Sequence, residues 1–265
     1  STREILLFSA IENHGDQLWV YRNGEGQWIG HDFIHFPVRG CYAQAAVRNQ
    51  SAHILAVGDI VEPVREWWEY KKEKTGNSWD YVFRRLFYTW TPDLTHENFG
   101  EALEIDNVDA TAGYIQNLDL WLGENHTVYL LYTRSPVQNE LLRDRFFPEM
   151  KLETSLHFVE IREGKIQRRV MLARGGEDII DPLPNYARFH HTPNGNLYVV
   201  GSESGRNWIQ EIHPSLGNRI TIPLQHPFST FFTATERGGS SPSEFLDLFG
   251  YGEANTLRYA CVKLH

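Results

Sequence analysis

The sequence has little cysteine, no cluster of basic residues and no long apolar run, and each absence excludes a class of protein. Two cysteines, Cys41 and Cys261, among 265 residues exclude a disulfide-rich scaffold and a cysteine-ligated zinc site. No apolar run approaches the roughly 18–20 residues of a membrane-spanning helix, so we expect no membrane span. With 25 Lys and Arg against 34 Asp and Glu, the formal net charge is −9, and nucleic acid is a poor candidate partner. No basic and apolar leader opens the printed sequence, and the compartment stays undetermined.

The composition is that of a folded chain rich in aromatic residues. Apolar residues make up 41% and charged residues 22%, which is enough apolar surface for a substantial core and excludes wholesale disorder. We expect a single domain over residues 1–265. Aromatic residues reach 13%, with 8 Trp. In β proteins such residues line carbohydrate-binding clefts as well as cores.

A repeated strand pattern indicates an all-β protein. Helical periodicity is nearly absent, and short alternating or apolar runs end at Gly, Asn, Pro or Asp. Three similar hairpins open at Tyr42, Tyr114 and Tyr186, and each is followed by two further predicted strands. A fourth inner strand opens at Phe228, so the spacings between openings are 72, 72 and 42 residues. Repeats of about 40–50 residues with about four strands each predict a β-propeller.

The number of blades depends on how the two ends of the chain are used. We expect four blades, with the hairpin of residues 3–21 and the C-terminal strands completing one blade, because this removes exposed sheet edges. Five blades are the alternative if segment 1–40 forms more than two strands. A fragment of a larger propeller and a β-sandwich are further alternatives. Cys41 and Cys261 could pair between the first and last blades, or remain unpaired buried thiols.

Two segments resemble a known group of propellers. Residues 85–99 are similar to a degraded Asp-box, with Thr91, Asp93 and Phe99 near its Ser, Asp and aromatic places. Residues 231–243, followed by 257–260, resemble the closing blade of uncharacterised members of the sialidase-like, BNR-repeat group. The resemblance implies a carbohydrate-active propeller, since that group includes glycoside hydrolases, polysaccharide lyases and lectin-like binders. The glycine of the box does not match and the three-arginine clamp of sialidases cannot be placed, so sialidase activity is not implied.

Two long connections are expected on one face of the propeller. Residues 59–81 and 134–153 are insertions of about 20 residues at equivalent places, and long loops on a rigid scaffold usually carry function. The residues in them that we expect to bind substrate are Trp67, Trp68, Trp79, Arg134 and Arg143. The alternative is that their aromatic side chains pack only against one another. The opposite face carries tight turns, and there we expect Arg237 and residues 238–243 to form a structural loop.

The inner strands are expected to place polar side chains around the axis on the side of the long connections. Strand alternation puts side chains two residues apart on the same side of a sheet. The inner-strand residues predicted at this mouth are Tyr42, Gln44, Tyr114, Gln116, Asn117, Tyr186, Arg188 and His190, joined by His31 from the connection before the first inner strand.

Such a set favours chemistry on a glycan that carries uronic acid. β-Elimination needs a group that neutralises the substrate carboxylate, here Arg188 with its amide neighbours Gln116 and Asn117. It also needs a base and an acid, for which His190, His31 and Tyr114 are the candidates. The predicted function is therefore a carbohydrate-active propeller that cleaves a glycan by β-elimination or by glycoside hydrolysis.

Two alternatives stay open from the residues alone. Hydrolysis usually needs two carboxylates roughly 5–10 Å apart. The available acids are Asp119, Asp32, Asp80 and Asp144, and the sequence pairs no two of them. A non-catalytic module that binds a glycan or a protein through Trp67, Trp68 and Trp79 is the rival to an enzyme. We expect an oligo- or polysaccharide as partner and no cofactor or catalytic metal, although loop aspartates could hold a structural Ca²⁺.

Overall fold

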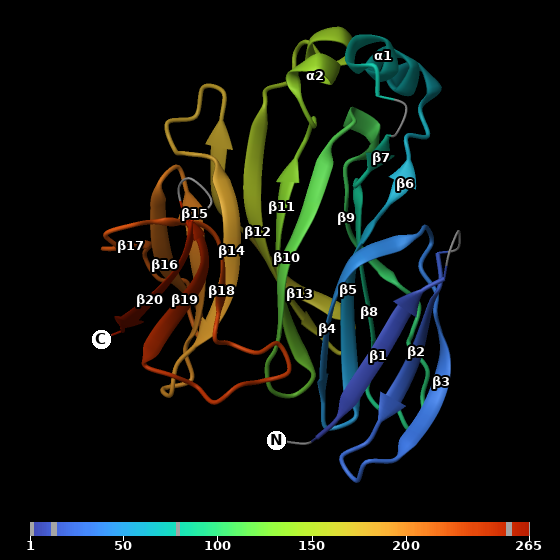
Figure 1. Cartoon of the computed structure of the whole chain (residues 1–265), viewed down its shortest axis with the longest axis vertical. Helices are drawn as coiled ribbons and strands as arrows, with labels where there is room; N and C mark the ends of the chain where they lie inside the picture. The colour runs from blue at the N-terminus through green and yellow to red at the C-terminus, as the bar shows by residue number, and fades with distance from the viewer. Residues whose placement is uncertain (1–2, 12–14, 78–79, 253–255, 265) are drawn as a thin grey trace.

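The computed structural model describes residues 3–11, 15–77, 80–252 and 256–264, and in these segments the chain is mainly β-strand. Figure 1 shows several sheets arranged side by side, with the two helices together at one end. No helix in the described segments is long and apolar enough to cross a membrane.

Five sheets of three or four strands follow one another along the chain, and within each the strand order is sequential. The first contains β1 (Ile5–Ala10), β2 (Gln17–Arg22) and β3 (Trp28–Ile34). The second contains β4 (Gly40–Arg48), β5 (Ser51–Gly58), β8 (Arg85–Thr91) and β9 (Leu103–Asn107). The third contains β10 (Tyr114–Leu122), β11 (Thr127–Ser135), β12 (Glu153–Arg162) and β13 (Lys165–Gly176). The fourth contains β14 (Pro184–His191), β15 (Leu197–Glu203), β16 (Arg206–His213) and β17 (Ile220–Ile222), and the fifth contains β18 (Phe228–Thr233), β19 (Phe245–Gly252) and β20 (Leu257–Lys263).

The first strands of successive sheets lie next to one another. β1 contacts β4, β4 contacts β10, β10 contacts β14, and β14 contacts β18. The core lies between neighbouring sheets, where for example Leu55 and Tyr88 of the second sheet join Leu120 and Tyr132 of the third in one buried cluster. The observed strands confirm those predicted for the first three repeats. Alternating apolar side chains on these strands can be buried only against another sheet, which is why the sheets pack on one another.

The two ends of the chain do not complete one sheet. β1 pairs with β2 and β2 with β3, whereas β18 pairs with β19 and β19 with β20. The predicted four-blade closure is therefore wrong, because pairing with a strand a few residues away costs less loop-closure entropy than pairing across the whole chain. The described residues of segment 1–40 form three strands, which is the condition for the five-blade alternative. The blade count itself stays a prediction.

Both long connections contain a helix that the sequence analysis did not anticipate. α1 (Arg65–Thr75) follows the short strand β6 (Ile60–Val61) and precedes β7 (Tyr81–Val82), which pairs with β6. α1 ends at Gly76, whose φ of 71° is the left-handed conformation that glycine adopts without strain. α2 (Glu140–Phe146) begins at Asn139, whose side chain accepts a hydrogen bond from the Leu142 amide at 3.1 Å.

The two cysteines do not pair. Both thiols are free, Cys41 on β4 partly buried and Cys261 on β20 exposed. The disulfide alternative is therefore wrong, and the expected burial of the thiols is incomplete. Their strands belong to different sheets, the second and the fifth.

Candidate functional site

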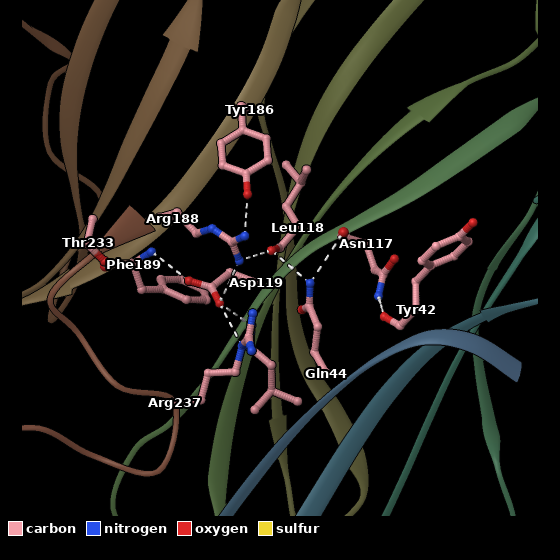
Figure 2. Close-up of polar contacts among 11 residues, drawn as sticks. Tyr42, Gln44, Asn117, Leu118, Asp119, Tyr186, Arg188, Phe189, Thr233 and Arg237 are labelled. Atoms are coloured by element: carbon pink, nitrogen blue, oxygen red, sulfur yellow. Dashed lines mark hydrogen bonds and ion pairs between the residues drawn. The ribbon is translucent and has the colours of Figure 1, made fainter. Parts of the chain in front are cut away.

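The buried carboxylate of Asp119 on β10 pairs with two arginines from distant parts of the chain (Figure 2). The β10–β11 register shifts between Asn117 and Asp119, which marks a bulge. Asp119 is 5% exposed, and its Oδ1 accepts from Nη1 of Arg188 at 3.2 Å and from Nε of Arg237 at 3.1 Å. Its Oδ2 accepts from the Phe189 amide at 3.1 Å. The carboxylate therefore links the third and fourth sheets to the segment that follows β18.

The Arg188 guanidinium is buried among hydrogen-bond acceptors and aromatic rings of the protein. Its guanidinium donates to the Leu118 carbonyl and to the Tyr186 hydroxyl. It also lies 4.9 Å from the ring centroid of Tyr186 and 4.9 Å from that of Phe232. Since only 6% of Arg188 is exposed, the guanidinium expected to neutralise a substrate carboxylate is largely committed to internal partners.

Arg237 approaches the same carboxylate from a more open position. Its side chain is 33% exposed, and its backbone carbonyl accepts from the Leu122 amide at 2.8 Å, which fixes the segment to the end of β10. Apart from the Nε bond to Asp119, its guanidinium has no side-chain partner in the described part of the chain. The expectation that this segment is only a structural loop is therefore incomplete.

A pocket of about 740 Å³ lies against this cluster. Asp119, Arg188, Arg237 and Phe232 all line it. The other lining residues are Glu4, Ala45, Ala46, Val47, Arg48, Asn49, Thr233, Thr235, Glu236, Gly238 and Gly239. Because the turn at Asn49 and the segment 235–239 form part of the wall, this pocket belongs to the turn face, which the sequence analysis expected to be featureless.

Five of the predicted inner-strand residues meet in a second, smaller pocket of about 240 Å³. They are Tyr42, Gln44, Tyr114, Gln116 and Asn117, and the remaining wall is Val57, Phe83 and Ile115. Hydrogen bonds to backbone carbonyls hold two of these side-chain amides in place. Asn117 Nδ2 donates to the Tyr42 carbonyl at 2.7 Å, and Gln44 Nε2 donates to the Leu118 carbonyl at 2.9 Å (Figure 2). Burial raises the pKa of Tyr114. The described lining has no charged side chain, so this pocket suits a neutral polar group.

The polar side chains predicted around the axis therefore do not share one mouth. Five of them line the smaller pocket, Arg188 lines the larger one, and Tyr186 and His190 line neither. Register shifts in β4, β10 and β14 interrupt the strand alternation on which that prediction depended. His190 is 2% exposed, its Nε2 lies 3.0 Å from the Ser243 carbonyl, and burial lowers its pKa. It lines neither of the two pockets. The structure therefore does not bring His190 to the mouth where it was expected beside Arg188.

The long connections pack on one another rather than around a ligand. The Trp67 ring of α1 lies 6.3 Å from Phe146 and 5.4 Å from Phe147, and the Arg84 guanidinium lies 5.0 Å from it. The Lys72 ammonium lies over Trp68 at 4.8 Å. These contacts agree with the alternative that the aromatic side chains hold the connections.

The remaining predicted binding residues lie apart from both pockets or outside the description. Arg134 pairs with Asp106 at 3.4 Å, and Arg143 pairs with Glu177 at 2.7 Å. The backbone of His31 lies on β3 opposite Val20, and its side chain is not described. Trp79 lies outside the described residues.

The Asp-box-like segment forms the connection from β8 to β9. Asp93 Oδ1 accepts from the Thr95 amide at 2.8 Å, and the Thr91 hydroxyl donates to the Glu97 carbonyl at 3.1 Å. Hydrogen bonds from Thr95 lower the pKa of Asp93. Over the described residues, no group of three or more His, Cys, Asp and Glu side chains could hold a metal ion.

Comparison with known proteins shows the type of fold but not the activity. No family model and no curated protein matches the chain. Its structure is similar to that of the polysaccharide lyase Uly1, with a TM-score of 0.53, 12% identity, and coverage of 99% of this chain and 56% of that one. The chain has a propeller-like fold. The fold likeness supports the general architecture expected from the repeats and carries no evidence specific to the sialidase-like group.

Two oxygenases show a similar degree of likeness. A lignostilbene dioxygenase from Pseudomonas brassicacearum has a TM-score of 0.54 at 9% identity, with coverage of 99% of this chain and 58% of the dioxygenase. A variant of Synechocystis apocarotenoid oxygenase has a TM-score of 0.51 at 9% identity, with coverage of 93% and 52%. The chain thus spans a little over half the length of these three structures. At such identities the likeness shows the fold alone, and the chemistry must be argued from the side chains.

Proposed function

We propose that this propeller-like protein binds an acidic glycan in the pocket beside Asp119, with Arg237 as the group that takes a uronate carboxylate. The observation that supports this proposal is that the buried carboxylate of Asp119 orients the partly exposed guanidinium of Arg237 at the pocket wall. Arginine binds carboxylates through charge-assisted hydrogen bonds from its planar fork, and a fixed fork loses less entropy on binding.

The pocket has a size and composition that suit a sugar ring. Its volume of about 740 Å³ falls within the range of ordinary ligand sites. Phe232, which is 60% exposed, offers an apolar ring for the carbon face of a sugar. Hydroxyl groups of a glycan would meet the Glu236 side chain that also lines the wall. A polysaccharide lyase among the structures of similar fold is consistent with a glycan ligand.

Binding is better supported than turnover. Because His190 is buried away from the pocket, the base expected for β-elimination is missing from this site. Glycoside hydrolysis would need two carboxylates across the bond, and Asp119 is occupied by two arginines.

The test is titration calorimetry with acidic and neutral oligosaccharides on the wild type and on Arg237→Ala. We expect the wild type to bind an acidic oligosaccharide, and Arg237→Ala to weaken it by roughly 10–100-fold, the range of a hydrogen bond to a charged group. The control is Arg206→Ala, because Arg206 is an exposed arginine on β16 away from the pocket. Equal affinity of wild type and Arg237→Ala, or no binding of any acidic glycan, would contradict the proposal.

The same ligands also separate binding from catalysis. Formation of an unsaturated uronate, detected by its ultraviolet absorbance, would establish a lyase. Binding without product formation would leave the protein a glycan-binding module.

A further inference from the structure

A further pocket on the turn face, distinct from the two described above, is lined by aromatic and imidazole rings, and we call it the ring-walled pocket. It has a volume of about 360 Å³ and lies where β10, β14 and β16 end. The side chains that matter here are Trp121, Tyr129, His191, His213, Arg162 and Glu124, all of which line it. None of them was singled out for chemistry by the sequence, because they stand at or near strand ends and turns of two different repeats.

The rings form a continuous wall from the third sheet to the fourth. The Trp121 ring lies 4.9 Å from that of His191 and 5.8 Å from that of Tyr129, and Tyr129 lies 6.0 Å from His213. Burial lowers the pKa of His191, so its ring is neutral at pH 7. Neutral rings of this kind contact the apolar faces of a sugar, while polar groups at their edges bind its hydroxyls.

One buried donor on this wall lacks a partner. Trp121 is 8% exposed, and its indole Nε1 has no hydrogen-bond partner in the described segments. Buried polar groups are nearly always hydrogen-bonded, so this donor would gain from a partner. Because the nitrogen is itself covered, a sugar hydroxyl or ring oxygen would reach it only after the side chains over it move.

This pocket adjoins the one beside Asp119. Arg48 and Gly239 line both, and Arg48 donates to the carbonyl of Gly123, which also lines the ring-walled pocket. Both pockets therefore belong to the same face and share a wall at Arg48. A ligand longer than one ring could extend from one into the other.

We propose that the pocket around Trp121, His191 and His213 is a second sugar subsite, which takes a sugar ring further along the chain than the disaccharide held at Arg237. The inference rests on the proposed function, since it deepens the same glycan site. The protein would then recognise an internal stretch of a chain, with affinity rising with ligand length as the second subsite fills.

The test measures the affinities of an acidic disaccharide and of a hexasaccharide from the same polymer. We expect the hexasaccharide to bind the wild type at least tenfold more tightly than the disaccharide. His213→Ala and Trp121→Phe, which keeps a ring but removes the donor, should lose most of this gain and bind the disaccharide as the wild type does. The control is His226→Ala, because His226 is exposed in the connection between β17 and β18.

The outcomes separate this inference from the proposed function. If the disaccharide binds but the wild type gains nothing from the longer chain, or if both variants keep the full gain, the second subsite is wrong and the Arg237 site stands. If no acidic glycan of either length binds, the proposed function fails and the subsite with it.

Discussion

Arg237 donates from Nε to Oδ1 of Asp119 at 3.1 Å, although 118 residues separate them in the chain. The bond ties the segment after β18 to the middle of β10. Since Arg188 binds the same oxygen from β14, one carboxylate joins segments from three repeats at the wall of the pocket of about 740 Å³. The arrangement makes Asp119 a structural residue and, under the proposed function, the residue that positions Arg237.

Asp119→Ala should strongly destabilise the protein. The substitution leaves Arg188, whose side chain is 8% exposed, without its counter-charge. Removing one partner of a buried ion pair typically costs about 3–5 kcal/mol. Urea denaturation would measure the loss in free energy of unfolding. As a control, Glu69→Gln breaks the exposed Arg65–Glu69 pair on α1 and should leave the midpoint unchanged; a similar midpoint for both variants would refute the prediction.

Glu62 should stabilise the protein above pH 4.5 and lose its effect in acid. Its buried carboxylate accepts from Arg84 at 2.8 Å and from Lys71 at 2.9 Å. Burial alone would raise its pKa, but the hydrogen bonds from Arg84 and Lys71 together outweigh it, and the pKa is lowered from 4.5. A lowered folded pKa stabilises the fold above the unfolded value, and this contribution disappears as pH falls through the folded value.

The measurement is the difference in unfolding free energy between wild type and Glu62→Gln as a function of pH. We expect Glu62→Gln to be less stable at pH 7 by about 3–5 kcal/mol, because Arg84 stays buried without its partner. The difference should shrink below pH 4.5. A difference that does not depend on pH would show that the carboxylate charge is not what stabilises this connection.

His53 should make the fold less stable as the solution becomes mildly acidic. Burial lowers its pKa from 6.5 to about 3, and its ring nitrogens lie 2.7 Å from the Tyr88 hydroxyl and 3.0 Å from that of Ser51. Between these pH values the unfolded chain binds a proton that the folded chain does not, so stability falls as pH drops below 6.5. The loss should be on the order of 2–3 kcal/mol between pH 7 and pH 4.5.

The check is the slope of unfolding free energy against pH in two variants. His53→Gln, which cannot take up this proton, should have a smaller slope between pH 4.5 and 6.5 than the wild type. His226→Gln changes an exposed histidine and should keep the wild-type slope. Parallel slopes in all three proteins would rule out His53 as the source.

Gly201→Ala should destabilise the fourth sheet. Gly201 on β15 lies opposite Trp208 on β16, and an added side-chain carbon would lie 2.1 Å from Cζ2 of that indole ring. Trp208 is 1% exposed and has no room to move aside, so we expect a loss of about 1–3 kcal/mol or more from overpacking. Thermal unfolding would measure it, with Gly24→Ala as the control because nothing lies within 4 Å of that position. Equal melting temperatures would contradict the packing argument.

The sequence by itself determined the strands and hairpins of the inner repeats. The runs that open at Tyr114 and Tyr186 alternate and end at turn residues, and the structure has strands there with tight turns between them. Such features depend on neighbours within a few residues. Asn125 and His126, for example, adopt φ values of 52° and 53°, as a short turn requires.

The tertiary structure decided where the site lies and which side chains face it. The bulge before Asp119 reverses the strand alternation from which the polar side chains around the axis were predicted. No local sequence pattern marks this bulge. The approach of Arg237 and the burial of His190 under Ser243 depend on a segment that folds back from the fifth sheet. Hairpins follow from short-range turn and strand preferences, whereas the direction of a side chain in a pocket follows from register and from contacts over a hundred residues apart, which only packing selects.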